Sequence, residues 1–220
     1  MRAEARPQLL DTSRIQLELQ RVKPTHSKIG EELEKLLGTV EIKVKRWFDL
    51  WKYLKWLLPQ WDRLGFNMQS QQQTNWCWAA TSTSTAVYYN ATTTWTQCTV
   101  ANGETGRTDC CGTGGPGACN VYGFLDTALT RVGHFDHRDN SAGTFASMKT
   151  EINASRPVGI RVAWSGGGAH FLAIIGYLDD ATDYVAVDDP IYGKSDITFA
   201  TLTSTYQSTG SWTHTYYTKA

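Results

Sequence analysis

Residues 69–89 read QSQQQTNWCWAATSTSTAVYY, and this stretch decides what fold to expect. The polar, turn-prone glutamines meet a helical pattern at Cys77, so the sequence predicts a helix that begins there and continues to Tyr89. A thiol at the first turn of a helix faces the positive end of the helix dipole, which favours the nucleophilic thiolate. Backbone N–H groups at the same place can stabilise an oxyanion. Cys77 is therefore a candidate nucleophile, and a buried structural cysteine is the alternative.

Beyond Pro157, short apolar and β-branched runs alternate with turns, a pattern typical of strands. The expected strands are VGIRVAW (158–164), HFLAIIGY (170–177), DYVAVDD (183–189), DITFATL (196–202) and SWTHTYYT (211–218). Short helices are expected over 123–132 and 145–154, and Gly-rich loops over 99–120. Residues 67–220 are therefore predicted to form an α+β unit.

A histidine and two aspartates complete a candidate constellation. His170 opens the run HFLAIIGY, where a buried strand would hold the imidazole rigidly enough for a general base or an ion-pair partner. The run DYVAVDD ends in Asp188 and Asp189, and the turn LDDATD returns them toward the level of His170. Such a carboxylate can accept a hydrogen bond from the imidazole and fix its tautomer. A core histidine and a turn-initiating aspartate are the structural alternatives.

Together these stretches resemble the papain-like cysteine peptidases. The resemblance rests on NWCWA at 75–79, Pro157-Val158, AHFLAIIGY around His170 and VDDP around Asp189, and it covers about residues 67–218. It is greatest to bacterial members such as the staphopains, the bacteriocin-processing peptidases and plant-pathogen effector peptidases. The resemblance implies an α+β papain-like fold, in which the nucleophile helix packs on an antiparallel sheet or half-barrel.

The resemblance also implies the catalytic roles. These are a nucleophile, its acid–base partner, an orienting residue and an oxyanion donor, carried by Cys77, His170, Asp189 and Gln71 respectively. Gln72 and Gln73 stay open as alternatives to Gln71, and Asp188 as an alternative to Asp189. The implied activity is hydrolysis of peptide bonds in a protein or peptide substrate, through a Cys77 thioester and without a cofactor. An acyl transferase, deamidase or isopeptidase with the same triad, and a non-catalytic papain-like module, are the alternatives.

Four further cysteines cluster within 22 residues: Cys98, Cys110, Cys111 and Cys119. Three pairings are conceivable, but a link between the vicinal pair would be strained, so two crossed or nested disulfides are expected. Adjacent cysteines do not fit the usual zinc knuckle, so we expect no metal and keep zinc as the alternative. Disulfides indicate an oxidising compartment and hence a secreted protein. The start, MRAEARPQLLDTSR, lacks the apolar stretch of a signal peptide, so a non-Sec route or a longer precursor would be needed.

The first 66 residues differ in composition from the rest of the chain. They carry 13 Lys+Arg and 9 Asp+Glu, whereas residues 67–220 carry 8 and 12 and all five Cys. The overall net charge of zero argues against a general nucleic-acid binder, and no apolar run is long enough to span a bilayer. We therefore expect two modules: a basic, helical, Trp-rich segment over 1–66 and a papain-like catalytic domain over 67–220.

The N-terminal segment shows a helical pattern within residues 41–62. Apolar side chains recur there at spacings of three and four, which lines one helical face, and they are Trp47, Leu50, Trp51, Leu54, Leu58 and Trp61. This face predicts docking on the catalytic domain or on a partner chain, and a helix at a membrane surface is the alternative. A prodomain that covers the cleft, an anchor and an unrelated fused module remain open, and the sequence does not determine an oligomeric state.

Overall fold

A curved antiparallel sheet is the centre of the computed structural model, which describes residues 60–112 and 117–220. The strands run in the order β2-β7-β3-β4-β5-β6, and the short β1 pairs with the end of β4. Their bounds are β1 (Asp62–Arg63), β2 (Phe135–Asp139), β3 (Val158–Trp164), β4 (Ala169–Leu178), β5 (Tyr184–Asp189), β6 (Gly193–Thr198) and β7 (Gly210–Thr218). With the helices below, this is the α+β class that the sequence predicts.

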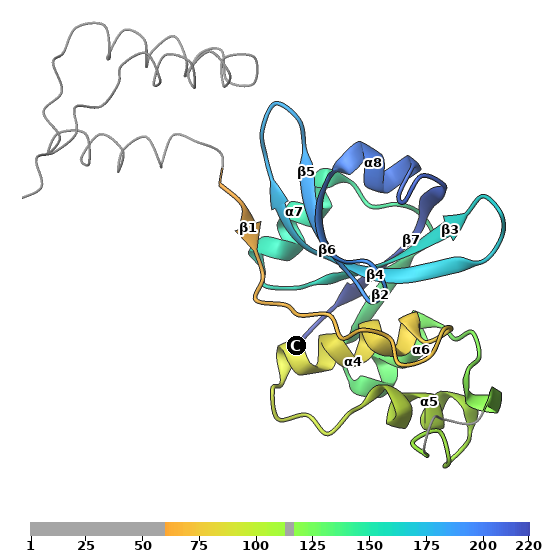
Figure 1. The fold of residues 1–220 in the computed structure, drawn as a ribbon. Coiled ribbons are helices and arrows are strands. Elements are labelled where there is room, and N and C mark those ends of the chain that lie inside the picture. Colours follow the sequence, from red (N-terminus) through yellow and green to blue (C-terminus); the bar gives the residue numbers. More distant parts are fainter. Residues whose placement is uncertain (1–59, 113–116) are drawn as a thin grey trace, which may run out of the picture. The chain divides into compact units, whose positions relative to one another are not determined.

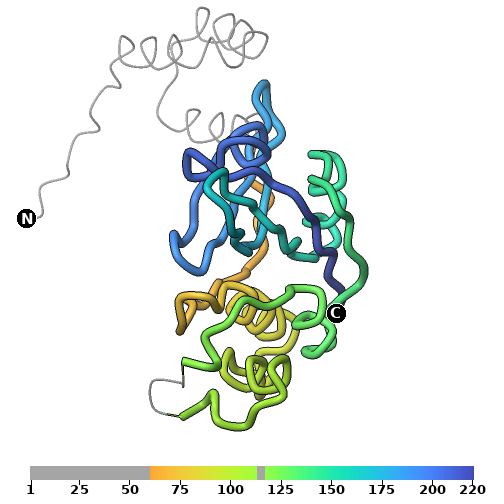
Figure 2. Tube along the Cα trace, turned by 90° about the vertical axis from the view of Figure 1, so that its right-hand side faces the viewer, coloured from red at the N-terminus to blue at the C-terminus, as the bar shows by residue number. Residues whose placement is uncertain are grey.

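The helices lie on both sides of this sheet (Figure 1). On one side are α4 (Cys77–Tyr89), α5 (Gln97–Thr105) and α6 (Leu125–Val132), and on the other are α7 (Phe145–Asn153) and α8 (Phe199–Ser204). A single turn of 3₁₀ helix, η1 (Gly117–Cys119), precedes α6. In the view turned by 90°, α4, α5 and α6 again gather apart from most of the strands (Figure 2).

β4 is buried along nearly its whole length because its side chains alternate between two faces. Phe171 packs in a core with α4 and α6, whereas Leu172 and Ile174 pack in a second core with side chains from α7 and α8. In a third cluster, Ile175 packs with Phe66, which precedes α4 in the sequence. The continuous apolar run in the sequence is therefore the signature of a strand that is covered on both faces.

Packing, rather than helix propensity, holds α4 in place. The helix contacts α6 and β4, and every residue of Cys77–Ala86 is buried. Threonine is a poor helix former, yet small Ala, Ser and Thr side chains allow close approach on all sides. The hydroxyls of Ser84 and Thr85 donate to the carbonyls of Ala80 and Thr81, four residues earlier, so these buried groups are paired.

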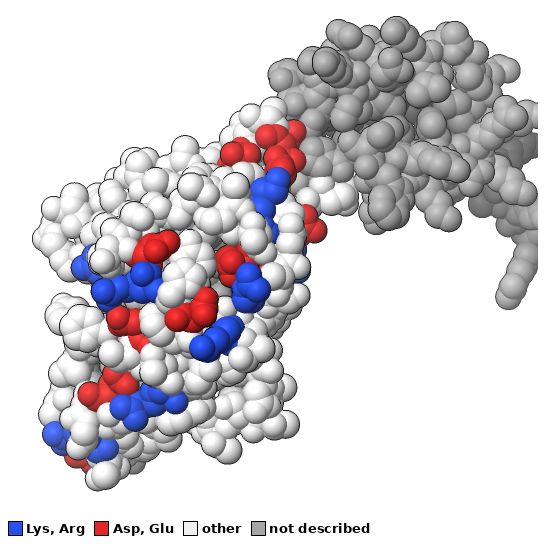
Figure 3. All heavy atoms as spheres, turned by 180° about the vertical axis from the view of Figure 1, so that it is seen from behind, with Lys and Arg blue, Asp and Glu red and all other residues white. Residues whose placement is uncertain are grey.

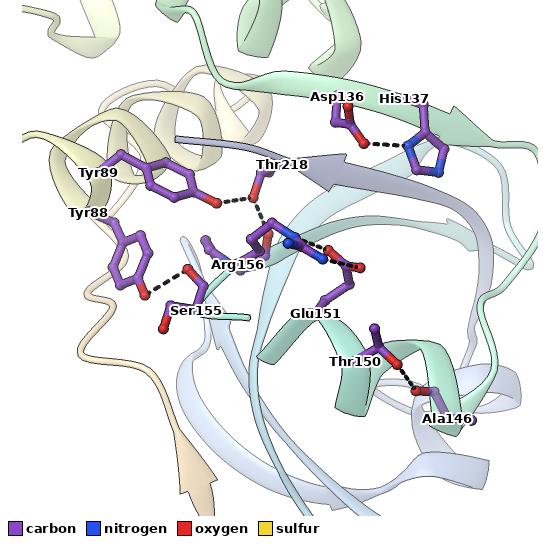
Figure 4. A network of polar contacts seen from close by, with 11 residues as sticks. Tyr88, Tyr89, Asp136, His137, Ala146, Thr150, Glu151, Ser155, Arg156 and Thr218 are labelled. Atoms are coloured by element: carbon purple, nitrogen blue, oxygen red, sulfur yellow. Dashed lines mark hydrogen bonds and ion pairs between the residues drawn. The ribbon is translucent and has the colours of Figure 1, made fainter. Parts of the chain in front are cut away.

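The C-terminal end of α4 is tied to neighbouring segments by two tyrosines (Figure 4). The hydroxyls of Tyr89 and Thr218 lie 2.8 Å apart, and the Tyr88 hydroxyl donates to the Ser155 carbonyl at 3.1 Å. A pocket of about 570 Å³ lies beside these tyrosines. It is at the opposite end of the helix from Cys77, so it is separate from the candidate nucleophile.

Two expectations for secondary structure are wrong. The stretch expected to be Gly-rich loop contains α5, because Thr96 and Thr99 form a capping box and Gly106, with φ 68°, ends the helix. The run DITFATL is not one strand, because β6 ends at Thr198 and α8 follows. The side chain of Thr198 accepts a hydrogen bond from the Thr201 N–H, so it caps the new helix.

The compact unit begins before the change in composition. It comprises Trp61–Ala220, since β1 pairs with β4 and Phe66 is fully buried. Residues 61–66 therefore belong with this compact unit, which begins six residues before the expected boundary. The helical segment expected over 1–66 and the docking of residues 41–62 otherwise fall on residues 1–59, outside the described part of the chain. None of the described helices has the length and apolarity to cross a membrane.

Charges of both signs are interspersed over the face shown in Figure 3. Surface ion pairs include Arg138 with Asp126 at 2.7 Å and Arg131 with Glu104 at 2.6 Å. Exposed pairs of this kind contribute little to stability.

Candidate active site

The candidate nucleophile, Cys77, is the first residue of α4 and is only 7 % exposed. Trp76 occupies the N-cap position, and no side chain caps this end of the helix. The first N–H groups of an α-helix have no acceptor within the helix. They therefore point, with the positive end of the dipole, to where a substrate oxyanion would form beside the thiol.

The tryptophans on either side of Cys77 attach the start of α4 to a neighbouring segment. The Trp76 indole Nε1 donates to the Cys119 carbonyl at 2.7 Å, and the Trp78 Nε1 donates to the Val121 carbonyl at 3.2 Å. Both rings are buried. The main chain at 119–121 is thus hydrogen-bonded to the residues on both sides of Cys77.

The same segment is held by further hydrogen bonds and by disulfides. The Asn75 N–H and Nδ2 donate to the side-chain and main-chain oxygens of Asn120, each at 2.9 Å. The four clustered cysteines form two crossed disulfides, Cys98–Cys111 and Cys110–Cys119, and Cys77 is the free thiol. Cys119 of this segment is thus linked to Cys110, whose neighbour Cys111 is linked to Cys98 of α5.

One group of three potential metal ligands occurs among the described residues: Asp109, Cys110 and Cys119. The two sulfur atoms of that group are bonded to each other, so they do not offer thiolate ligands.

A buried ion pair lies where β4 begins and β5 ends. His170 Nε2 lies 2.9 Å from Asp189 Oδ1 and 3.0 Å from Oδ2, and these side chains are 4 % and 0 % exposed. Asp189 Oδ1 also accepts the N–H groups of Ile191 and Tyr192, at 2.7 and 2.9 Å. Oδ2 accepts the Tyr206 hydroxyl at 2.8 Å. These four donors hold the carboxylate in position and stabilise its negative charge.

Electrostatic interactions link the imidazole to both the carboxylate and the thiol. Burial alone would lower the pKa of His170, but hydrogen bonds to Asp189 and Cys77, with their charges, raise it to about 9. Burial would raise the pKa of Asp189, yet the bond to His170 and its positive charge hold that pKa below the usual value. Because Nε2 is engaged by Asp189, Nδ1 is the ring nitrogen left for the thiol.

Asp188 has a different set of partners, as alternation along a strand requires. Its Oδ2 accepts the Met68 N–H at 2.8 Å and lies 3.9 Å from Lys194 Nζ. Burial raises the pKa of this carboxyl. These contacts hold the chain segment that leads into the active site, whereas Asp189 contacts His170.

Gln71 lies in the loop ahead of the nucleophile. Its Nε2 donates to the carbonyls of Gln73 and Thr74 at 2.9 and 2.8 Å, and its Oε1 is buried without a hydrogen-bond partner. Both Nε2 protons are thus used within the loop, so one must be released before Gln71 can donate to an oxyanion. Gln72 is exposed, and its N–H is bound by Gln97 Oε1 at 2.9 Å.

A comparison with protein families identifies the chain. The family model described as papain-like cysteine protease AvrRpt2 matches residues 59–207, a stretch that contains Cys77, His170 and Asp189. The chain belongs to this family. The predicted resemblance to papain-like cysteine peptidases is thereby confirmed, and the protein is an enzyme, a hydrolase. No curated protein matches the chain.

As a papain-like cysteine protease, the enzyme acts on a protein or peptide substrate. Sequence reasoning missed three features of its site: the indole bonds of Trp76 and Trp78, the pairing of Asn75 with Asn120, and the hydroxyl of Tyr206 on Asp189. The pattern Trp-Cys-Trp was visible, but its partners lie more than 40 residues away. Nothing in the sequence around Tyr206 marks it as a residue of the site.

Proposed function

We propose that this protease hydrolyses peptide bonds through a thioester on Cys77, with His170 as acid–base group and Asp189 as the residue that orients it. The observation that carries this proposal is the buried His170–Asp189 pair, which leaves Nδ1 for the thiol at the start of α4. With its pKa near 9, His170 remains an imidazolium at neutral pH and favours an ionised thiol beside it.

Acylation begins when the Cys77 thiolate attacks the scissile carbonyl carbon, so that a C–S bond forms and the carbonyl π electrons move to oxygen. The first N–H groups of α4 stabilise this oxyanion, and Gln71 joins them when its amide leaves the loop carbonyls. The proton on His170 Nδ1 passes to the leaving nitrogen, the C–N bond breaks, and the amine product departs.

Deacylation uses the same groups in reverse roles. Neutral His170 takes a proton from water as the water oxygen attacks the thioester carbonyl. The C–S bond then breaks, the carboxylic product leaves, and the thiolate and imidazolium are restored. Asp189 keeps the ring oriented through both steps and stabilises its positive charge.

Labelling of the thiol tests this proposal directly. Iodoacetamide should give a single adduct that peptide mapping places on Cys77, and hydrolysis of fluorescent casein should fall in proportion to labelling. Cys77→Ala should be inactive, with a melting temperature close to that of the parent. Full casein hydrolysis by Cys77→Ala, or by the labelled protein, would contradict the proposal. Mass spectrometry of the products distinguishes hydrolysis, which adds one water across two fragments, from deamidation or acyl transfer.

Three further predictions, on the fold, the domain organisation and export, also belong to the proposal. The fold is papain-like, supported by the packing of α4 on β4. A separate N-terminal module precedes the catalytic unit, supported by the division of the chain at Gln60 and Trp61. Export to an oxidising compartment is supported by the two disulfides.

A further inference from the structure

The hydroxyl of Tyr206 is bound to the catalytic carboxylate, and we propose that Tyr206 is a positioning residue, which sets the orientation of Asp189 and through it that of His170. This inference rests on the proposed function, because Tyr206 has a catalytic effect only if the pair it contacts takes part in the reaction. Tyr206 is 1 % exposed and lies in the connection between α8 and β7. Its Oη donates to Asp189 Oδ2 at 2.8 Å.

The two oxygens of Asp189 are held from different directions. Main-chain N–H groups of the turn after β5 hold Oδ1, and among the described residues Tyr206 is the side chain other than His170 that bonds Oδ2. His170 Nε2 lies almost equidistant from both oxygens, at 2.9 and 3.0 Å. Loss of the Tyr206 hydroxyl would leave His170 as the one described side chain on Oδ2, so the carboxylate could pivot about its anchored Oδ1 and tilt the imidazole with it.

The backbone around Tyr206 is a tight turn with little freedom. The N–H and carbonyl of Tyr206 bond to the carbonyl and N–H of Gly210, at 2.9 and 2.8 Å. Gln207 and Ser208 between them have φ of 47° and 73°, a conformation that is costly for residues other than glycine. A Cβ on Gly210 would lie 2.4 Å from a methyl group of Val162, so only glycine fits there. Strain of this kind persists where the surrounding structure holds the chain in one place.

The ring of Tyr206 also belongs to a stack that includes the catalytic imidazole. Trp164 stacks on Tyr206 with centroids 6.4 Å apart, and on His170 with centroids 6.1 Å apart. Burial, and next the charge of Asp189, raise the pKa of Tyr206 far above its usual value. The hydroxyl therefore stays protonated and remains a donor to the carboxylate throughout the working pH range.

Tyr206→Phe removes the hydroxyl and keeps the ring, and Tyr177→Phe is its matched control. Tyr177 lies on β4, is 6 % exposed, and donates its hydroxyl at 2.9 Å to Asn153, which is remote from the triad. Casein hydrolysis is measured per active site, counted as the Cys77 that iodoacetamide alkylates at about pH 6, where the protonated thiol of unfolded protein reacts slowly. The charge of His170 is followed by the rate of Cys77 alkylation with iodoacetate, because this anionic reagent is attracted by the imidazolium.

In the parent, iodoacetate alkylation relative to neutral iodoacetamide should decline as pH rises through about 9, where His170 loses its charge. In Tyr206→Phe, kcat per titrated site should fall about tenfold with KM within twofold, since small misplacements of a catalytic group cost up to ~10²-fold. The decline of the iodoacetate rate should move to lower pH, because a displaced carboxylate stabilises the imidazolium less. Tyr177→Phe should match the parent in kcat per titrated site and in the pH at which the iodoacetate rate declines. If either quantity in Tyr206→Phe stays at the parent value, the inference is overturned.

A second variant covers the case in which Tyr206→Phe does not fold. Asp189→Asn/Tyr206→Phe removes the buried charge together with its donor, and so avoids an unpaired carboxylate. If Tyr206 acts through Asp189, this double variant should match Asp189→Asn in activity per site, and a further loss would overturn the inference. A parent without Cys77-dependent turnover would instead count against the proposed function, so the two failures are distinguishable.

Discussion

The two sides of the active site are held by different kinds of interaction. On the cysteine side, neutral indole and amide groups bond to main-chain carbonyls, and crossed disulfides secure the segment they bind. On the histidine side, an ionised pair is buried in the sheet and surrounded by donors. Cys77 is therefore positioned by packing and cross-links, whereas His170 and Asp189 are positioned by charge.

This difference determines how each side responds to change. A neutral hydrogen bond contributes about 0.5–1.5 kcal/mol and does not titrate near neutral pH. A buried ion pair that loses one partner leaves an uncompensated charge, at a cost of about 3–5 kcal/mol. Among the residues that position Cys77 and His170, substitution and pH should therefore affect activity more on the histidine side. Reduction of the disulfides should affect stability more on the cysteine side.

Among variants that keep both Cys77 and His170, the largest effect is expected from the adjacent aspartates of β5. Asp189→Ala should lower casein hydrolysis per titrated site by about 10–1000-fold, because His170 loses the acceptor that orients it. Asp188→Ala should stay within a few-fold of the parent, since this carboxylate contacts Met68 rather than the imidazole. Both variants are compared at temperatures where circular dichroism shows them folded. The reverse ranking would transfer the orienting role to Asp188.

A smaller effect, on stability, is expected from the disulfides of the cysteine side. Replacing both members of Cys110–Cys119 or of Cys98–Cys111 with alanine should lower the free energy of unfolding by about 3 kcal/mol, measured in urea. The first change should also alter the rate at which iodoacetamide alkylates Cys77, because the Cys119 carbonyl binds Trp76. The pH at which the iodoacetate rate declines should stay near 9, since His170 is untouched. A shift of that pH would mean that the two sides are not independent.

The smallest effect, again on stability, is expected at β1, which belongs to neither side of the active site. A chain that starts at Gly65 lacks the pairing of β1 with β4 that a chain from Gln60 retains. The shorter chain should be less stable in urea by about 2 kcal/mol, because it loses those hydrogen bonds and the packing of Trp61 and Leu64 against the Phe66 cluster. Activity per titrated site should be equal in the two. A large difference in activity would show that β1 supports the site, and that the comparison of its two sides is incomplete.

Much of the candidate site follows from local patterns in the sequence. The change from polar loop to helix predicted where α4 begins, and the strand pattern of DYVAVDD placed Asp188 and Asp189 at a strand end near His170. Both patterns involve residues that are neighbours in the sequence. The direction of their side chains follows from the regular repeat of a helix or a strand. The capping box of α5 was also present in the sequence, at Thr96 and Thr99, although glycines and cysteines nearby favoured a loop.

Other features depended on residues that are distant along the chain. The partners of Trp76 and Trp78, and of Tyr206 on Asp189, are set by how loops pack against the sheet. The disulfide pairing depended in the same way on which sulfur atoms packing brought together. The sequence by itself thus determined the residue types and local geometry of the candidate catalytic groups. Only the tertiary structure decided which groups hold them, because burial and long-range contacts have no period that a sequence can display.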